Sequence, residues 1–296
     1  MKEVSKILIA YDGSSCSEAA IDDLTRAGLP LNAEAVVISA ADIILPPPDE
    51  RLPADDVPAV RIPEVERRAK ARAAKATKEA RVLAERAAKR IKADFPEWNV
   101  KTEVHCDAPA WAVIKTADSH GSDLIIVGSH GHSLVGGRLI LGSVSQRVLY
   151  EAPCSVRVAR CFDLRRSGPA RIVIGFNGSP DSQLAVAAVA ARHWPEGSEA
   201  LVVTAHHRLE KSMHDFAMEA LRAASLLTSE KSVAGDPAHV LLHEAKEWSA
   251  DSIFVGTRDL HGVQHLLHGS VSSAVAARAQ CSVEVTRASR SQSEQV

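Results

Sequence analysis

The chain has 296 residues, which is enough for two domains of about 150 residues each. Hydrophobic residues make up 46% of it and aromatic residues only 4%, so a packed core would consist mostly of alanine, valine, leucine and isoleucine. The 35 basic and 37 acidic residues nearly balance, which gives no overall field that would attract nucleic acid or an anionic membrane.

The sequence favours a cytoplasmic location. The apolar run near the amino terminus is far too short for a signal peptide, and no segment approaches the roughly 20 apolar residues of a membrane span. Five cysteines form no CxxC pair, and their odd number favours a reducing compartment and structural thiols. We therefore expect no nucleic-acid partner and no membrane contact.

Three segments of the chain recur in the same order. The matching pairs are residues 6–24 with 171–189, residues 123–131 with 251–259, and residues 141–160 with 268–287. Self-similarity of this kind predicts two homologous domains. We expect them at residues 1–160 and 171–288, joined by a linker at 161–170 and followed by a flexible tail at 289–296.

Short runs rich in β-branched residues alternate with helical stretches in each half. The predicted strands are residues 6–11, 35–40, 99–106, 123–128 and 155–160, and then 171–176, 200–205, 229–234, 252–256 and 282–287. Most of these runs are apolar without alternation, which is typical of strands that helices cover on both faces. The order of elements predicts an α/β fold with two tandem open parallel five-stranded sheets flanked by helices.

The last predicted strand of each half has a different pattern. Residues 155–160 and 282–287 alternate apolar and polar side chains, which indicates one buried face and one wet face, as at a sheet edge. The two edges either pair, which would join the halves as a pseudo-symmetric dimer, or are capped independently. We favour pairing.

The halves differ in one long segment. Residues 42–66 contain six prolines and predict an extended loop, and a helix is expected from Pro63 to about Asp94. One stripe of this helix is apolar, and its other face carries many lysine and arginine side chains. Because no aromatic residues interleave with them, we interpret this basic face as solvated rather than as a nucleic-acid interface.

Glycines follow the predicted strand at 123–128. Ligands of an open parallel sheet bind beyond the carboxyl ends of the strands, and glycine there lets a ligand approach the main chain. Residues 142–145 then begin a helix, whose first amide groups and partial positive charge can hold phosphate. The hydroxyls of Ser143 and Ser145 and the charge of Arg138 would add to this cradle. The alternative is structural: Ser143 and Gln146 form a capping-box pattern, and the glycines serve only the turn.

Asp12 stands at the carboxyl end of the first predicted strand. It therefore lies on the same edge of the sheet as the glycines, and we call this edge, where the parallel strands end, the rim. Its carboxylate could accept hydrogen bonds from a ribose or adenine, or help to hold Mg²⁺, or only form the turn. Ser14 or Ser15 can cap the following helix, with Glu18 closing a box to Ser15.

These residues resemble the universal stress protein family in its tandem two-domain form. The resemblance covers nearly the whole chain outside the proline-rich loop and the tail, and its most specific element is the pattern G-x2-G-x9-G-[ST] followed by a helix. It implies Rossmann-like sheets of strand order 3-2-1-4-5, ATP in each competent domain, with or without Mg²⁺, and a role in stress survival.

The resemblance also implies which residues of the first half bind the nucleotide. They are Asp12, Ser39, Ala40, Gly128, Gly131, Gly142, Ser143, Val144 and Ser145. His130 either contacts phosphate or lies at the loop surface. Ten residues separate Gly131 from Gly142, where the family pattern has nine.

The second half departs further from the pattern. Asn177 stands in the place of Asp12, and Asp259 stands in the place of Gly131. A carboxylate about 5 Å from a phosphate would repel it by roughly 3 kcal/mol at an effective dielectric constant of about 20. We expect ATP to bind mainly in the first half.

The sequence thus predicts a binding protein in which ATP changes conformation or assembly, with an unknown protein partner or a homodimer, and with no assigned catalytic residue. Two alternatives stay open. One is a nucleotide-independent protein-interaction module, which the ten-residue spacing favours. The other is a slow ATP hydrolase, for which Arg138 is the candidate to contact the triphosphate. His239 and His243 are four residues apart on a predicted helix, but two histidines alone do not define a zinc site.

Overall fold

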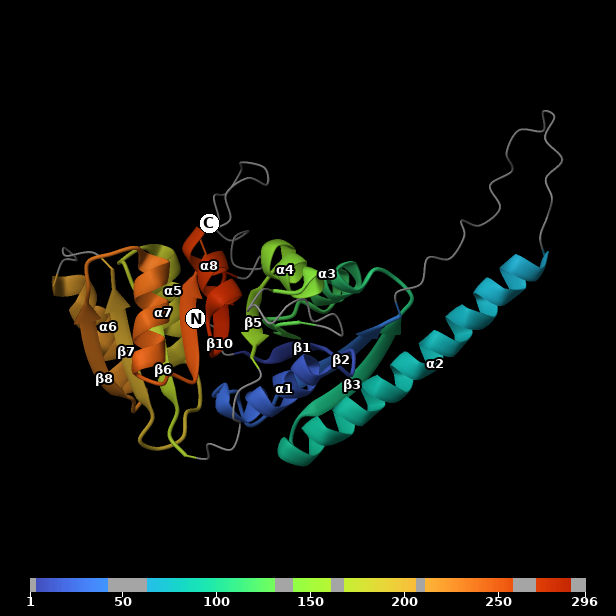
Figure 1. Cartoon of the computed structure of the whole chain (residues 1–296). Helices are drawn as coiled ribbons and strands as arrows, with labels where there is room; N and C mark the ends of the chain where they lie inside the picture. Colours follow the sequence, from blue (N-terminus) through green and yellow to red (C-terminus); the bar gives the residue numbers. More distant parts are fainter. Residues whose placement is uncertain are drawn as a thin grey trace.

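The strands of both halves form a single sheet. The computed structural model describes residues 4–41, 63–130, 141–160, 168–205, 211–257 and 270–288. Its ten strands have the order β3-β2-β1-β4-β5-β10-β9-β6-β7-β8 (Figure 1). Each half therefore has the strand order 3-2-1-4-5, and the halves join edge to edge. The expected tail, and most of the expected proline-rich loop and linker, lie outside the described residues.

The strands lie within about two residues of their predicted places. In the first half they are β1 (Lys6–Ala10), β2 (Glu34–Ala40), β3 (Asn99–His105), β4 (Leu124–Gly128) and β5 (Ser155–Ala159). In the second half they are β6 (Arg171–Gly175), β7 (Glu199–Thr204), β8 (Leu227–Ser232), β9 (Ser252–Gly256) and β10 (Ser282–Thr286). Neighbouring strands within each half are parallel, as predicted.

Helices cover both faces of the sheet. They are α1 (Ser15–Asp23), which continues as a 3₁₀ turn over Leu24–Arg26, then α2 (Pro63–Asp94), α3 (Pro109–His120), α4 (Ser143–Glu151), α5 (Pro180–Ala190), α6 (Lys211–Ala223), α7 (Pro237–Glu247) and α8 (Ser270–Arg278). Helices α3, α4, α7 and α8 enclose one apolar core that both halves share. On the other face, α1 and α2 enclose a core of the first half, and α5 and α6 enclose a core of the second.

The two halves meet along β5 and β10, which pair antiparallel with Arg157 opposite Glu284. The predicted pairing of the two edges is thereby confirmed. Because the repeat aligns β5 with β10, this contact relates the halves by an approximate two-fold axis and makes the chain a pseudo-dimer. We call this contact the seam.

The polar face of the seam is buried, so the prediction that it is wet is wrong. Arg157 is 0% exposed and Glu284 is 1% exposed. Arg157 donates from Nε and Nη2 to the carboxylate of Asp23 at 2.6 and 3.0 Å, and its Nη1 lies 3.5 Å from Glu284. Arg192 also donates to Glu284, and Ser282 donates to Asp23 at 2.8 Å. The polar side chains alternate along these strands because they pair across the seam and not because water covers them.

Two arginines just beyond the seam each reach into the opposite half. Arg160, which follows β5, donates to the backbone carbonyls of Ala276 and Ala277 near the end of α8. Arg287, which follows β10, donates to the carbonyls of Leu149 and Ala152 at the end of α4. The last carbonyls of a helix lack partners within the helix and carry a partial negative charge. Each half thus satisfies a helix end that belongs to the other.

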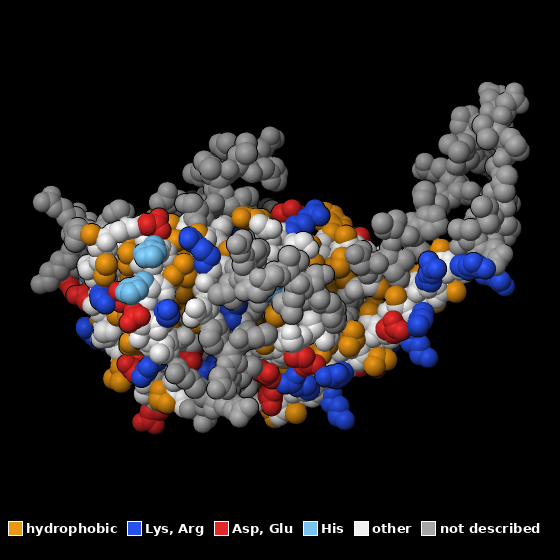
Figure 2. All heavy atoms as spheres, in the orientation of Figure 1, with side chains coloured by type: hydrophobic (Ala, Val, Ile, Leu, Met, Phe, Trp, Pro, Cys, Tyr) orange, Lys and Arg blue, Asp and Glu red, His pale blue; other side chains and the backbone are white. Residues whose placement is uncertain are grey.

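Helix α2 is 32 residues long and extends beyond the sheet (Figure 1). The later part of its predicted apolar stripe is buried against the sheet at Ala80, Ala87 and Ile91, whereas Ala69 and Ala76 are only half-buried. Basic side chains stand along its outer face and are exposed apart from the half-buried Arg90 (Figure 2). Neither α2 nor any other helix in the described part of the chain combines the length and apolarity needed to cross a membrane.

The buried thiols are expected to be chemically inert. Burial raises the pKa of Cys154 and of Cys281 to about 12, whereas Cys106 is exposed. Only the thiolate reacts with alkylating agents. Iodoacetamide at pH 8, followed by peptide mass mapping, should therefore modify Cys106 and spare Cys154 and Cys281 until denaturant is added. Rapid labelling of either buried thiol in the native protein would contradict this assignment.

The seam should tolerate loss of its central charge poorly. Arg157→Met leaves Asp23 and Glu284 buried beside an apolar side chain, and removing one partner of a buried ion pair costs about 3–5 kcal/mol. We expect that loss in the free energy of unfolding measured in urea. Arg147→Ala is the control, because Arg147 pairs with Glu151 on the exposed surface of α4. It should cost at most about 1 kcal/mol. Equal effects of the two substitutions would refute the role given to the seam.

Candidate functional site

The predicted site residues of the first half gather where β1, β2 and β4 end. The chain passes from β1 to β2 on one side of β1 and returns to β4 on the other, so strand order reverses between β1 and β4. A crevice at such a reversal is where open parallel sheets bind ligands. Asp12, Ala40, Gly128 and His130 all follow or end these strands. Gly131 and Arg138 lie outside the described residues.

Asp12 forms the turn between β1 and α1 and keeps its carboxylate at the surface. Its Oδ1 accepts a hydrogen bond from the amide of Ser14 at 2.9 Å, and Gly13 between them has a φ of +78°. Ser14 caps α1 by accepting from the amide of Ser17 at 3.2 Å. Asp12 is therefore a turn former, as in the simpler of the two interpretations, and its exposed position at the rim leaves the ligand-binding interpretation open.

Glu18 does not close a capping box with Ser15; its carboxylate binds the hydroxyl of Tyr11 and the guanidinium groups of Arg86 and Arg90 on α2. Burial, together with the hydrogen bond to Glu18, raises the pKa of Tyr11 to about 12. The predicted capping box was wrong because Arg86 and Arg90 of α2 bind the Glu18 carboxylate. These partners lie far away in sequence, so the residues of the turn alone do not reveal them. This contact ties α1 to α2 beneath the rim.

The structure gives Gly128 a packing role. A β-carbon at this position would lie 2.7 Å from the backbone carbon and oxygen of Cys16 and 2.9 Å from the amide nitrogen of Ser17. These distances are too short for any side chain, so glycine is required for the end of β4 to pass the first turn of α1. Gly256 is in the same situation in the second half, where the added β-carbon would be 2.2 Å from the carbonyl oxygen of Asp181.

The first turn of α4 lies against the end of β4. The amide of Gly142 donates to the carbonyl of Ser129 at 2.8 Å, and the buried hydroxyl of Ser145 donates to the same carbonyl at 2.9 Å. The Ser145 hydroxyl therefore fastens the helix to the strand. Sequence reasoning missed Ser129, because only the folded turn brings its carbonyl to α4.

The N-terminus of α4 has no side-chain cap. Gly142 is the N-cap residue, and the first intrahelical bond runs from the amide of Gln146 to the carbonyl of Gly142. The capping box between Ser143 and Gln146, the structural alternative, is thus not formed, since the helix begins one residue earlier than such a box requires. Ser143 is exposed and Val144 is half-buried. Their amide groups precede the first intrahelical donor, and such groups can bind an anion.

Two further predicted site residues, Ser39 and His130, have polar contacts within the protein. The Ser39 hydroxyl is buried and donates to the carbonyl of Tyr11, so it holds β2 to the end of β1. The half-buried ring of His130 has its Nδ1 3.1 Å from the Ser129 hydroxyl. Burial, and then the charge of Arg160, lower the pKa of His130. Arg160 thereby brings positive charge near this rim.

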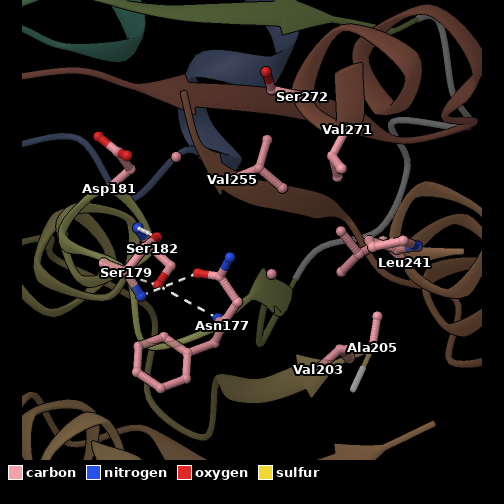
Figure 3. Close-up of a pocket in the computed structure, with 14 residues that line it drawn as sticks. Asn177, Ser179, Asp181, Ser182, Val203, Ala205, Leu241, Val255, Val271 and Ser272 are labelled. Atoms are coloured by element: carbon pink, nitrogen blue, oxygen red, sulfur yellow. Dashed lines mark hydrogen bonds between the residues drawn. The ribbon is translucent and has the colours of Figure 1, made fainter. Parts of the chain in front are cut away.

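The second half has a cavity of about 180 Å³ at the equivalent strand ends (Figure 3). It is lined by Gly175, Phe176, Asn177, Ser179, Asp181, Ser182, Val203, Ala205, Pro237, Leu241, Val255, Gly256, Val271 and Ser272. Asn177 repeats the turn of Asp12, because its Oδ1 accepts from the amide of Ser179 at 3.1 Å. Asp259 lies outside the described residues.

Sequence reasoning missed the acidic residue Asp181 in the second half. The repeat aligns it with Cys16, which is buried in the first half. Comparing the two halves position by position would have found it. Within the described residues, no three histidine, cysteine or acidic side chains converge as metal ligands.

The two parallel halves of the sheet each have a glycine at the end of the fourth strand and a helix N-terminus beside it. This arrangement defines a tandem Rossmann-like α/β protein. The universal stress protein family matches the chain twice, over residues 3–160 and 169–287, and the chain belongs to this family.

Relatives of similar length share this tandem organisation. The chain is 28% identical over 307 residues to a universal stress protein of Mycobacterium tuberculosis, covering 96% of this chain and 97% of the relative. A universal stress protein from Archaeoglobus fulgidus has a similar fold, with a TM-score of 0.67 at 18% identity, covering 95% of this chain and 98% of that one. A functionally unknown protein from Pseudomonas aeruginosa also has this fold, with a TM-score of 0.56 at 14% identity and coverage of 96% and 92%.

The packing role of Gly128 leads to a test. Gly128→Ala should lower the free energy of unfolding by about 1–3 kcal/mol, because the added methyl group forces α1 away from β4. Gly256→Ala should cost at least as much, since its closest backbone contact is shorter. Urea denaturation measures both. Unchanged stability of Gly128→Ala would mean that the glycine is present for another reason, such as close approach of a ligand.

Proposed function

We propose that the protein binds one ATP molecule through its first half and that the bound nucleotide changes its conformation or assembly. The observation that carries this proposal is the uncapped N-terminus of α4, which stands at the strand-order reversal on the same rim as the Asp12 carboxylate. The amides of Ser143 and Val144 would hold phosphate. Asp12 and Ala40 would face the ribose and the adenine, and Gly131 and Arg138 would complete the loop.

Electrostatics supports an anion at this rim. The helix N-terminus supplies about half a positive charge, and the charge of Arg160 acts on His130 beside it. The second half departs from this arrangement, because Asn177 replaces Asp12, the residue proposed to face the ribose and Mg²⁺, and Asp259, which would repel phosphate, stands in the place of Gly131. We therefore expect one ATP per chain rather than two. Mg²⁺ would accompany the triphosphate through Asp12.

Membership of the family supports a role in stress response, and we further propose a cytoplasmic location and a protein partner or second copy that reads the bound state. We assign no residue to hydrolysis. A nucleotide-independent interaction module is the second candidate, which the additional residue between Gly131 and Gly142 favours.

Two substitutions of Ser143 separate the proposed phosphate-binding amide from the hydroxyl. Proline is well accepted at the first position of a helix, and the extended backbone of Gly142, with ψ at 158°, suits a residue before proline. Ser143→Pro removes the amide donor, whereas Ser143→Ala removes only the hydroxyl. A hydrogen bond to a charged group contributes about 1.5–3 kcal/mol, so Ser143→Pro should weaken ATP binding about 10- to 100-fold.

Isothermal titration calorimetry of the full chain with ATP and Mg²⁺ measures both affinity and stoichiometry. One site per chain, weakened by Ser143→Pro much more than by Ser143→Ala, would support the proposal. No binding would favour the interaction module, and two equal sites would contradict the assignment to the first half. Equal unfolding temperatures of the two variants serve as the control for folding.

A further inference from the structure

The second half contributes a side chain to the helix that carries the proposed phosphate site. We propose that Arg287 is a positioning residue for the N-terminus of α4, so that the nucleotide site of the first half is complete only with the second half in place. This inference rests on the proposed function, because it names what controls the same site. It also gives the second half a role that requires no ligand of its own.

The antiparallel seam brings Arg287 to the end of α4. Strand β10 runs opposite to β5, with Val285 beside Val156, so the carboxyl end of β10 lies next to the start of β5. The amide of Arg287 donates to the hydroxyl of Ser155, the first residue of β5, at 3.1 Å. Helix α4 ends at Glu151, just before β5. The guanidinium group of Arg287 therefore meets the last turn of α4.

Helix α4 lacks a C-terminal cap from its own half. Its last turn contains no basic residue, and its C-cap residue, Ala152, is extended, whereas α3 ends in the left-handed glycine Gly121. Arg287 supplies the missing partners, because its Nη1 donates to the carbonyl of Ala152 at 3.0 Å and its Nη2 donates to the carbonyl of Leu149. The arginine is only 9% exposed, so water cannot easily take its place. A cation at this end also complements the helix dipole.

The two ends of α4 are held by different halves. At the N-terminus, the amide of Gly142 and the hydroxyl of Ser145 both donate to one carbonyl, that of Ser129. Two bonds to a single atom let a helix pivot, so they do not fix its direction. Arg287 holds the far end, about 13 Å away along a helix of nine residues. The direction in which the first amides of α4 point thus depends on the second half.

Loss of this attachment should lower the fraction of molecules in which α4 can bind phosphate. Helices shorter than about 12 residues are marginal on their own, so α4 depends on its contacts. The buried side chains of Val148 and Leu149 hold it against the sheet, but they do not satisfy its last carbonyls. When the last turn frays or the helix pivots, the apparent affinity falls in proportion to the competent fraction.

Hydrogen exchange of the full chain without nucleotide tests the attachment itself. In Arg287→Met, the peptide that covers α4 should exchange about tenfold faster, because the charged hydrogen bonds to its last turn are lost. The peptide that covers α8 should be unchanged. Arg160→Met is the mirror-image control, since Arg160 donates to the carbonyls of Ala276 and Ala277, and it should accelerate α8 and spare α4. Unchanged exchange of α4 in Arg287→Met would overturn the inference.

Calorimetric titration with ATP and Mg²⁺ tests the effect on the proposed site. Arg287→Met should weaken ATP binding about three- to tenfold, which corresponds to a competent fraction of about one third to one tenth. Arg287→Lys keeps the charge and can donate to one carbonyl, so it should lose less, and it serves as the test if Arg287→Met does not fold.

Arg26→Met is the matched control for this titration. Arg26 also bridges the halves, because it binds Asp251 at 2.7 Å, but it follows α1 on the opposite face of the sheet from α4. The substitution should leave the ATP affinity within about twofold of that of the unsubstituted chain. A loss equal to that of Arg287→Met would overturn the inference, because any weakened contact between the halves would then have the same effect.

Adenosine shows whether the loss acts through phosphate. Its affinity, measured by ligand-detected NMR, should be the same in Arg287→Met as in the unsubstituted chain. Equal losses for ATP and adenosine would contradict the inference, because they would indicate general damage to the first half. If the unsubstituted chain binds no ATP, the proposed function fails and this inference fails with it. ATP binding that Arg287→Met leaves unchanged overturns this inference alone.

Discussion

The architecture depends on a buried network of ion pairs that crosses from one half to the other. Arg157 and Asp23 come from the first half, and Glu284 and Arg192 come from the second, yet all four are nearly inaccessible to water. Removing these groups from water costs several kcal/mol for each ion, and only the assembled network offsets that cost. The antiparallel register of β5 and β10 follows, because it sets Arg157 opposite Glu284. The two halves therefore form one continuous sheet.

The repeat made most of the fold predictable, since two copies of one strand–helix pattern give two parallel sheets with the same strand order. The surroundings of β5 could not be predicted, because Asp23 and Arg192 lie far from Arg157 in sequence. Alternation of apolar and polar residues along a strand indicates a solvent-exposed face only when the polar side chains have no partner within the protein. At the candidate site, the strand ends and the helix start were predictable. The internal bonds of Ser39 and Ser145, and the packing role of Gly128, depend on contacts that appear only in the folded chain.

The same backbone geometry holds different chemistry in the two halves. Asp12 and Asn177 make equivalent turn bonds, at 2.9 and 3.1 Å, and differ in the group that faces the rim. Tyr11 is matched by Phe176, which has no hydroxyl, and Cys16 is matched by Asp181. All three differences lie between the end of the first strand of each half and the first turn of the following helix, where side chains do not determine the pairing of the strands. Because of this location, the side chains at the strand ends can differ between the two halves without any change in strand pairing.

The pairing of Arg157 with Glu284 also makes the seam selective for two unlike halves. These residues occupy equivalent positions of the repeat, and each stands opposite the other across the approximate two-fold axis. Two copies of the first half joined in the same register would bring arginine against arginine, and two copies of the second would bring glutamate against glutamate. Like charges at the middle of such a contact would repel each other. Covalent linkage of unlike halves thus allows an arrangement that a symmetric pair of identical chains would find electrostatically frustrated.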